Sequence, residues 1–254
     1  MLHYIDPAPE NAPAVVLLHG LGANGESWLL QVPPLTEAGF RPLAPDMPGF
    51  GKSPYDGKGW SVTRCAAETA ALLDDLGVDA AHVVGLSMGG VIAQRFALDF
   101  PHRVRKLVLV STFAALRPKS AGEWLYFAWR FFLVHTLGLP AQAKAVAKRL
   151  FPRPEQEAFR QMLIEAVAQA DPRAYRAAMR ALWRHDARRA LRALDIPTLV
   201  VTGEEDTTVP PESQRQLAGL IPGARQVVIP GAGHALSVDS PEAFNRELLA
   251  FLTE

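Results

Sequence analysis

The serine at position 87 lies in a segment whose residue types and spacing suit covalent catalysis. It is the centre of a Gly-x-Ser-x-Gly pattern, with Gly85 and Gly89 two residues away on either side. An apolar run precedes the pattern and a helix-like run follows it, which predicts a sharp turn with strained backbone angles at the serine. Glycine removes the side chains that would collide with neighbouring elements at such a turn. The serine hydroxyl would then stand at a helix N-terminus, where free amides favour a developing negative charge.

A serine hydroxyl needs a base to accept its proton and a carboxylate to orient that base. His234 follows an apolar run in a glycine-rich loop, the kind of place where open α/β sheets carry their chemistry. Taken alone, such a histidine is more often a polar loop residue, and the serine pattern by itself also fits an ordinary turn. Glu204, Glu205 and Asp206 crowd another loop of the same kind, and residue chemistry alone does not separate them.

The elements that must position these residues follow a repeating pattern of short apolar runs and helical stretches. The runs are continuous rather than alternating, as in a parallel sheet covered by helices on both faces. The fold class is therefore predicted as α/β, with a mostly parallel, doubly wound sheet. Only residues 2–5 are available as a strand before the first run. The runs lie at residues 15–18, 41–44, 81–84, 107–110, 198–202 and 226–229.

Between about residues 112 and 184 the strand-like runs give way to alanine, arginine and aromatic residues at helical spacing. Prolines punctuate this stretch, and several of them suit the first turn of a helix. The expected organisation is a core domain of residues 1–112 and 185–254, with an inserted helical cap, or lid, of about four helices at residues 113–184. The first of these helices has more apolar surface than one helix face can bury.

Composition and charge narrow the classes of partner. Hydrophobic residues make up 49% of the 254 positions, charged residues 20%, and the formal net charge is +0, so no field attracts nucleic acid or an acidic membrane. The single cysteine, Cys65, forms no internal disulfide, and no Cys/His cluster has zinc-ligand spacing. The N-terminus has no signal-peptide pattern, and no stretch predicts stable membrane insertion. These features favour a cytoplasmic protein without a metal, and a monomer or a homodimer.

The segment around Ser87 resembles the nucleophile elbow of the α/β-hydrolase superfamily, in its branch of serine carboxylesterases, enol-lactonases and haloperoxidase-like enzymes. The resemblance covers nearly the whole chain outside the lid. Many members of the superfamily begin with a full β-hairpin, so with only residues 2–5 in that place the sheet here is expected to be a strand short at that edge. Supporting motifs are His19-Gly20-Leu21-Gly22, the segments 46–53, 100–104 and 203–206, and Gly233-His234.

The resemblance implies a role for several residues. It implies Ser87 as the nucleophile and His234 as its base. It selects Asp206 as the orienting carboxylate, because the superfamily's loop commonly reads Gly, two variable residues and Asp, with Glu205 as the fallback. It also implies an oxyanion hole formed by the backbone N–H groups of Leu21 and Met88. His19 is expected to be structural, bonded to nearby backbone.

Single positions discriminate among the reactions of the superfamily. A serine at position 87 disfavours haloalkane dehalogenases and epoxide hydrolases, which carry aspartate there. Carbon-carbon hydrolases of ring-cleavage products typically have asparagine before the serine and tryptophan after the histidine, whereas this chain has Leu86 and Ala235. The leading hypothesis is a hydrolase of a small carboxylic ester or lactone, acting through an acyl-enzyme without a cofactor. A carbon-carbon hydrolase, acyl transfer to another acceptor, and a ligand receptor that retains the triad remain the alternatives.

The lid sequence suggests what the substrate looks like. Trp124 and Phe127 are expected to line a pocket over Ser87, which favours an apolar substrate group, although the aromatic residues would equally serve to pack the lid onto the core. A basic run follows, in which solvated helix faces explain most positions and one arginine could bind a substrate carboxylate. The run comprises Arg173, Arg176, Arg180, Arg184, Arg188 and Arg189.

Overall fold

The computed structural model describes residues 1–118 and 120–254, and its described residues form a seven-stranded sheet of order β1-β3-β2-β4-β5-β6-β7. All neighbouring strands run parallel except β1, which pairs antiparallel with β3. Each of the six predicted runs is a strand, so the predicted mostly parallel α/β fold is confirmed. The strands are β1 (Tyr4–Ile5), β2 (Ala14–Leu18), β3 (Arg41–Pro45), β4 (Ala81–Leu86), β5 (Val104–Val110), β6 (Thr198–Gly203) and β7 (Arg225–Ile229).

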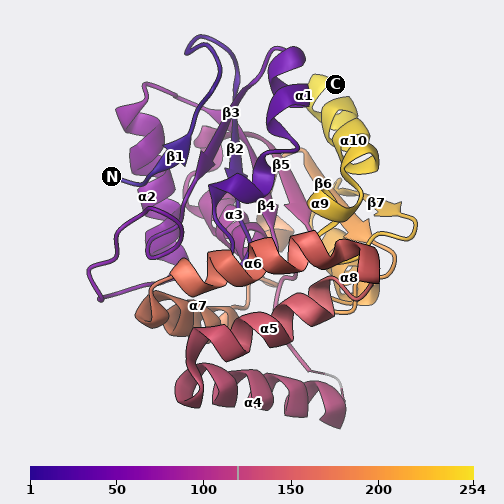
Figure 1. The fold of residues 1–254 in the computed structure, drawn as a ribbon. Helices are drawn as coiled ribbons and strands as arrows, with labels where there is room; N and C mark the ends of the chain where they lie inside the picture. The colour runs from indigo at the N-terminus through magenta and orange to yellow at the C-terminus, as the bar shows by residue number, and fades with distance from the viewer. Residues whose placement is uncertain (119) are drawn as a thin grey trace.

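Ten α-helices surround this sheet within the described residues, and Figure 1 shows their placement. The helices are α1 (Val32–Glu37), α2 (Val62–Asp75), α3 (Met88–Asp99), α4 (Ala121–Thr136), α5 (Gly138–Leu150), α6 (Glu157–Gln169), α7 (Pro172–Arg184), α8 (Pro211–Leu220), α9 (Leu236–Asp239) and α10 (Pro241–Thr253). The first strand has only two residues and leads directly into the loop before β2, as expected from the short N-terminal segment.

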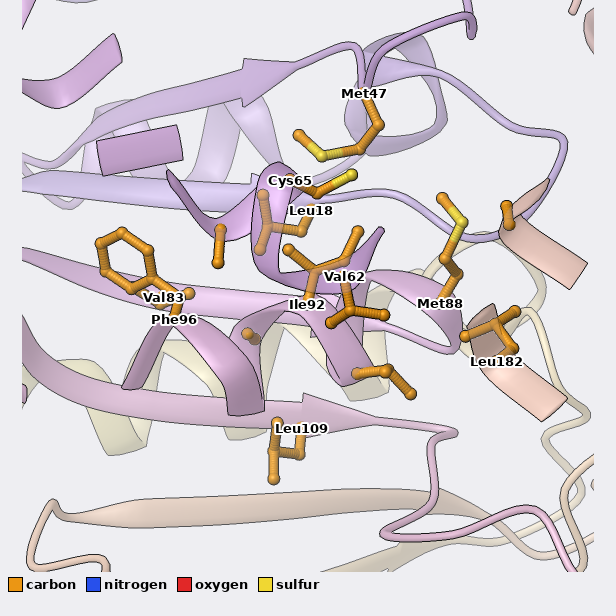
Figure 2. Close-up of a cluster of buried hydrophobic side chains, with 14 of the residues drawn as sticks. Leu18, Met47, Val62, Cys65, Val83, Met88, Ile92, Phe96, Leu109 and Leu182 are labelled. Carbon is orange, nitrogen blue, oxygen red and sulfur yellow. The ribbon is translucent and has the colours of Figure 1, made fainter. Parts of the chain in front are cut away.

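The central strands are buried on both faces because successive side chains point to opposite sides of the sheet. In β2, Val16 and Leu18 join one buried cluster, whereas Val15 and Leu17 join the other. The first cluster contains apolar side chains of α2, α3 and α8, and the second contains those of α1 and α10. Figure 2 shows the first cluster, in which Cys65 packs as an apolar side chain and burial raises the pKa of its thiol. Covered faces explain why the sequence runs are continuous.

Helices α4 to α7 gather at one end of the sheet, with α4 outermost and α6 nearest the strands in the view of Figure 1. Four helices is the number expected for residues 113–184. The two ends of this segment meet, because Ala115 bridges Asp186 and the Ala187 N–H donates to the Ala114 carbonyl over 2.9 Å. The division into core and lid stays a prediction. Among the described residues, no helix combines the length and the apolar character that a bilayer crossing requires.

Two glycines let the strand, the turn and the helix around Ser87 pack without a gap. A Cβ on Gly85 would lie 2.3 Å from the Gly89 carbonyl oxygen, and a Cβ on Gly89 would lie 2.0 Å from the carbonyl oxygen of Leu18 in β2. Both distances are far below van der Waals contact, and the obstacles are backbone atoms that have no freedom to move aside. These positions therefore tolerate no side chain, as the sequence pattern predicted.

We expect Gly89→Ala to lower the free energy of unfolding by about 1–3 kcal/mol or more, because an added methyl group must displace buried backbone. The matched control is Gly219→Ala in α8, where an added Cβ meets no atom within 4 Å. That variant should gain up to about 1 kcal/mol, since alanine is the better helix former. Urea unfolding measures both changes. Equal effects of the two substitutions would contradict the steric explanation.

Buried histidines link the stability of the fold to pH. The ring of His82 in β4 meets the edge of Phe40 at 5.6 Å, and its Nδ1 has no hydrogen-bond partner among the described residues. Burial, aided by the positive charges of Lys106 and Arg105, lowers the pKa of His82 to about 4. Burial likewise lowers the pKa of His185 to about 4. Between pH 6.5 and 4 the unfolded chain therefore binds more protons than the folded chain.

The folded state should thus lose stability as the pH falls from about 6.5 to about 4, with no such loss above that range. We expect His82→Gln to make this decline shallower, because one group that protonates only on unfolding is removed. His102→Gln, at an exposed position, is the control and should leave the slope as it is. Thermal melts at half-unit pH steps give the slope for each protein. An unchanged slope in His82→Gln would show that this histidine does not couple to folding.

Candidate active site

Ser87 occupies the turn between β4 and α3 with backbone angles that an L-residue rarely adopts. Its φ is 54° and its ψ is −110°, as the sharp turn predicted. Its N–H donates to the Val110 carbonyl at the end of β5 over 2.9 Å, and its carbonyl accepts from the Thr112 hydroxyl over 2.8 Å. Such strain costs about 1–3 kcal/mol and persists only where the surroundings hold it. Here the end of β5 and the residues after it hold both the N–H and the carbonyl of Ser87.

Asp206 lies in the loop after β6, where it is 2% exposed. Its Oδ1 accepts the backbone N–H groups of Thr208 and Val209 over 2.9 and 2.8 Å. Its Oδ2 accepts the Gln214 side-chain amide over 3.0 Å and lies 2.9 Å from His234 Nδ1. Four donors therefore surround one buried carboxylate. Such a network compensates for the cost of removing the charge from water and fixes the direction of the carboxylate.

His234 lies in the loop after β7, next to the loop that carries Asp206. The two loops touch so closely that a Cβ on Gly203 would lie 2.2 Å from the Gly233 carbonyl oxygen. The Gly233 N–H also donates to Asp239 Oδ2 over 3.1 Å, and burial raises the pKa of the Asp239 carboxyl. Because a carboxylate accepts at His234 Nδ1, that nitrogen carries the proton and Nε2 is left with a lone pair.

The other two acids of the Asp206 loop lie in different surroundings. Glu204 and Glu205 are exposed. Glu204 accepts the Gly231 N–H over 3.0 Å, and Glu205 lies 3.8 Å from Arg153. Of these three described acids, Asp206 is the one that contacts His234. The structure therefore separates the carboxylates that residue chemistry could not.

The glycine-rich loop after β2 lies beside the serine turn. A Cβ on Gly20 would lie 3.8 Å from the Ser87 Cβ, so this loop borders the serine directly. His19 is fully buried; its Nε2 accepts the Met47 N–H over 2.9 Å, so its Nδ1 donates to the Gly20 carbonyl over 2.8 Å. Burial lowers the pKa of His19. His19 thus joins the loop after β2 to the loop after β3 through hydrogen bonds to backbone, which agrees with the expected structural role.

A cavity of about 350 Å³ joins these elements. Ser87 and His234 both line it, together with Leu21 from the glycine-rich loop. Met88 is the first residue of α3, so its N–H has no acceptor within the helix. The walls come mainly from apolar residues of the lid segment and the nearby loops, including Phe113, Phe127, Phe131, Val146, Leu150, Phe151, Phe159, Met162, Leu163, Met179, Leu182 and Trp183.

The structure places the two expected pocket residues differently. Phe127 lines the cavity, but Trp124 does not. Trp124 is 54% exposed and packs its ring against Trp183 at 5.1 Å, beside a separate hollow that includes Arg180 and Arg184. The expectation for Trp124 therefore needs correction, because Trp124 lies one turn before Phe127 on α4 and lines the neighbouring hollow instead of the cavity. No member of the basic run at 173–189 lines the cavity that holds Ser87; the arginine there is Arg130 of α4.

Gln214 of α8 is a site residue that the sequence did not reveal. It is fully buried, and its amide nitrogen also donates to the Val209 carbonyl over 2.8 Å. A glutamine on an amphipathic helix carries no sequence signal of its own. Only the packing of α8 against the loop after β6 shows that it holds the carboxylate.

Comparison with known proteins agrees with this geometry. Residues 13–241 match the family described as "alpha/beta hydrolase fold". A protein of Stutzerimonas stutzeri (strain A1501) named "Putative carbamate hydrolase RutD" is 33% identical over 250 residues, covering 96% of this chain and 93% of that protein. The enol-lactonase from Burkholderia xenovorans LB400 superposes with a TM-score of 0.91 at 29% identity, covering 100% of this chain and 96% of that one. A bromoperoxidase from Bacillus anthracis does so with a TM-score of 0.89 at 28% identity, covering 100% and 95%.

The family match spans strands β2 to β7, the serine turn and the loops that carry Asp206 and His234. Relatives above 30% identity extend over nearly the full chain, and the structural superpositions cover all of it. This chain is therefore a hydrolase that belongs to the α/β-hydrolase family.

Proposed function

We propose that this chain is a serine hydrolase that cleaves a small carboxylic ester or lactone through an acyl-enzyme intermediate. The observation that carries the proposal is the 2.9 Å contact between His234 Nδ1 and Asp206 Oδ2, made by a histidine that lines the same cavity as Ser87. A histidine oriented by a carboxylate, beside a serine on a strained turn, is the arrangement that activates a hydroxyl for acyl transfer.

In the proposed mechanism, His234 acts first as a base and then as an acid in each half-reaction. Ser87 Oγ attacks the ester carbonyl while His234 Nε2 takes the hydroxyl proton, and the same nitrogen then gives that proton to the leaving alkoxide. A water molecule, whose proton passes to His234 Nε2, next attacks the acyl carbonyl, and His234 gives that proton to Ser87 Oγ as the acid is released. Asp206 stays ionised throughout and stabilises the imidazolium.

The negative charge of each tetrahedral intermediate needs donors beside Ser87. We propose the N–H groups of Met88 and Leu21 for this role. The Met88 N–H is at the first position of α3 and so has no acceptor within the helix. The loop that carries Leu21 borders Ser87 at Gly20. One such donor typically contributes about 2.7–4 kcal/mol to lowering the barrier.

The cavity favours an apolar acyl or alcohol group, since most of its lining side chains are aromatic or aliphatic. Hydrolysis of a carbamate is the second candidate, because relatives that are 33% identical carry that name. A carbamate presents the same carbonyl to Ser87 and would follow the same two steps. We place the ester first because the apolar walls suit a hydrocarbon group, and the enol-lactonase aligned over the whole chain is named for an ester-type bond.

We expect Ser87→Ala to lower kcat for short p-nitrophenyl esters by at least about 10³-fold, because the nucleophile is lost while the fold is kept. Ser27→Ala is the matched control, since Ser27 also lines the cavity but its hydroxyl donates to the Asn24 carbonyl. A fluorophosphonate should label the wild-type chain at Ser87 and leave Ser87→Ala unlabelled.

Retained activity in Ser87→Ala would overturn the proposal. Release of a single equivalent of p-nitrophenol per chain, with no further cycles, would instead indicate a ligand receptor that keeps the triad. Carbamates with the same leaving group, assayed in parallel, rank the two candidate substrates by kcat/KM.

Gln214 offers a test of how the carboxylate is positioned. We expect Gln214→Met to lower kcat about tenfold, because Asp206 loses one of its four donors, and to leave KM nearly unchanged, since Gln214 does not line the cavity. Gln216→Met on the same helix is exposed and should match the wild type. Steady-state kinetics and a thermal melt separate the effects on catalysis and stability. A change in KM alone would contradict the positioning role.

A further inference from the structure

Arg130 is the one lysine or arginine among the described residues that line the cavity with Ser87. It projects from α4, at the lid end of a cavity whose other walls are largely apolar. A guanidinium remains charged at all physiological pH values, and its partial removal from water costs free energy unless it is paired. The groups that surround Arg130 therefore indicate which kind of ligand the cavity suits.

Two buried polar side chains hold the guanidinium in place. With the Gln142 amide turned so that its oxygen faces the arginine, Oε1 accepts from Arg130 Nη2 over 2.8 Å and from Nε over 2.9 Å. The Tyr175 hydroxyl lies 3.4 Å from Nη2. Both Gln142 and Tyr175 are fully buried. These partners are neutral, so they orient the guanidinium without balancing its charge.

Other arginines of the lid segment have carboxylate partners, which makes the contrast informative. Arg160 pairs with Glu157, and Arg173 pairs with Asp171. None of the ion pairs between described residues includes Arg130. The two acids that line the cavity, Glu26 and Glu165, are exposed, and Glu26 lies 4.0 Å from Lys52. Neither acid lies within ion-pair distance of Arg130, and no described residue accepts a hydrogen bond from its Nη1.

We propose that the substrate carries a carboxylate that pairs with Arg130, so that the natural ester is a half-ester or lactone of a dicarboxylic acid. The inference rests on the proposed hydrolase function and narrows its substrate class. The ester carbonyl lies at Ser87, the hydrocarbon chain lies along the apolar walls, and the free carboxylate meets the guanidinium. A planar guanidinium with its orientation fixed by Gln142 suits the two oxygens of a carboxylate.

The test compares two esters that differ only at the far end: the mono-p-nitrophenyl ester of adipic acid and p-nitrophenyl hexanoate. We expect the wild type to have the higher kcat/KM for the anionic ester. In Arg130→Gln the ratio of kcat/KM, anionic over neutral, should fall about 10- to 100-fold, the size expected for a lost charge-assisted hydrogen bond. Arg130→Lys should give an intermediate ratio. Arg180→Gln, outside this cavity, is the control and should keep the wild-type ratio.

Further readouts separate this inference from the function on which it rests. Raising the salt concentration should lower the wild-type ratio of kcat/KM. This measurement needs no variant and so does not depend on whether Arg130→Gln folds.

If the wild type hydrolyses neither ester, the proposed function fails, and a binding experiment then tests the carboxylate site. Quenching of tryptophan fluorescence, to which Trp183 of the cavity contributes, compares adipamic acid with hexanamide. Tighter binding of the acid in the wild type, lost in Arg130→Gln, supports the carboxylate site. A ratio unaffected by Arg130→Gln or salt, or equal binding of both amides, would overturn it.

Discussion

The steric fit around Ser87 is the constraint on which the rest of the site depends. Gly85, Gly89 and the carbonyl of Leu18 pack so closely that a single Cβ at either glycine would overlap backbone atoms. This contact forces the chain through a turn at positive φ, and the hydrogen bonds to Val110 and Thr112 keep it there. Because α3 begins at Met88, directly after this turn, the serine and a backbone N–H without an acceptor in the helix lie next to each other. Local strain is thus supported by the two neighbouring strands.

The second half of the site is built from loops that are distant in the sequence and adjacent in the sheet. Because β6 pairs with β7, the loops after these strands meet, and Gly203 allows them to touch. Asp206 is then surrounded by four donors, one of which is His234. A buried carboxylate with this many donors is costly to disturb, which gives the histidine a single orientation. The orienting network and the strained serine meet at one cavity, and this supports the proposed acyl transfer.

Residues of helices α4 to α7 line much of the cavity that holds Ser87. Phe127 and Phe131 supply apolar wall, and Arg130 between them supplies a cation held by neutral, buried partners. An apolar cavity with one oriented guanidinium favours a substrate that is hydrocarbon along its length and anionic at one end. Trp124, on the same helix, faces a separate hollow. Trp124 and Phe127 are three residues apart and lie on the same side of α4, one turn apart along its axis, so which of them reaches the cavity depends on how α4 packs on its neighbours.

Strand-like runs and glycine positions predicted the sheet and the serine turn, because these patterns reflect local sterics that do not depend on distant residues. The family resemblance added the structural role of His19 and selected Asp206 among three acids. The tertiary structure decided which acid contacts His234, which lid residues line the cavity and where Gln214 lies, because these depend on contacts between segments far apart in the chain. It also changed the role of Arg130. In the sequence this residue only interrupts an apolar stretch, whereas in the folded chain it is the cation of the cavity, since helix packing alone sets which side of α4 turns inward.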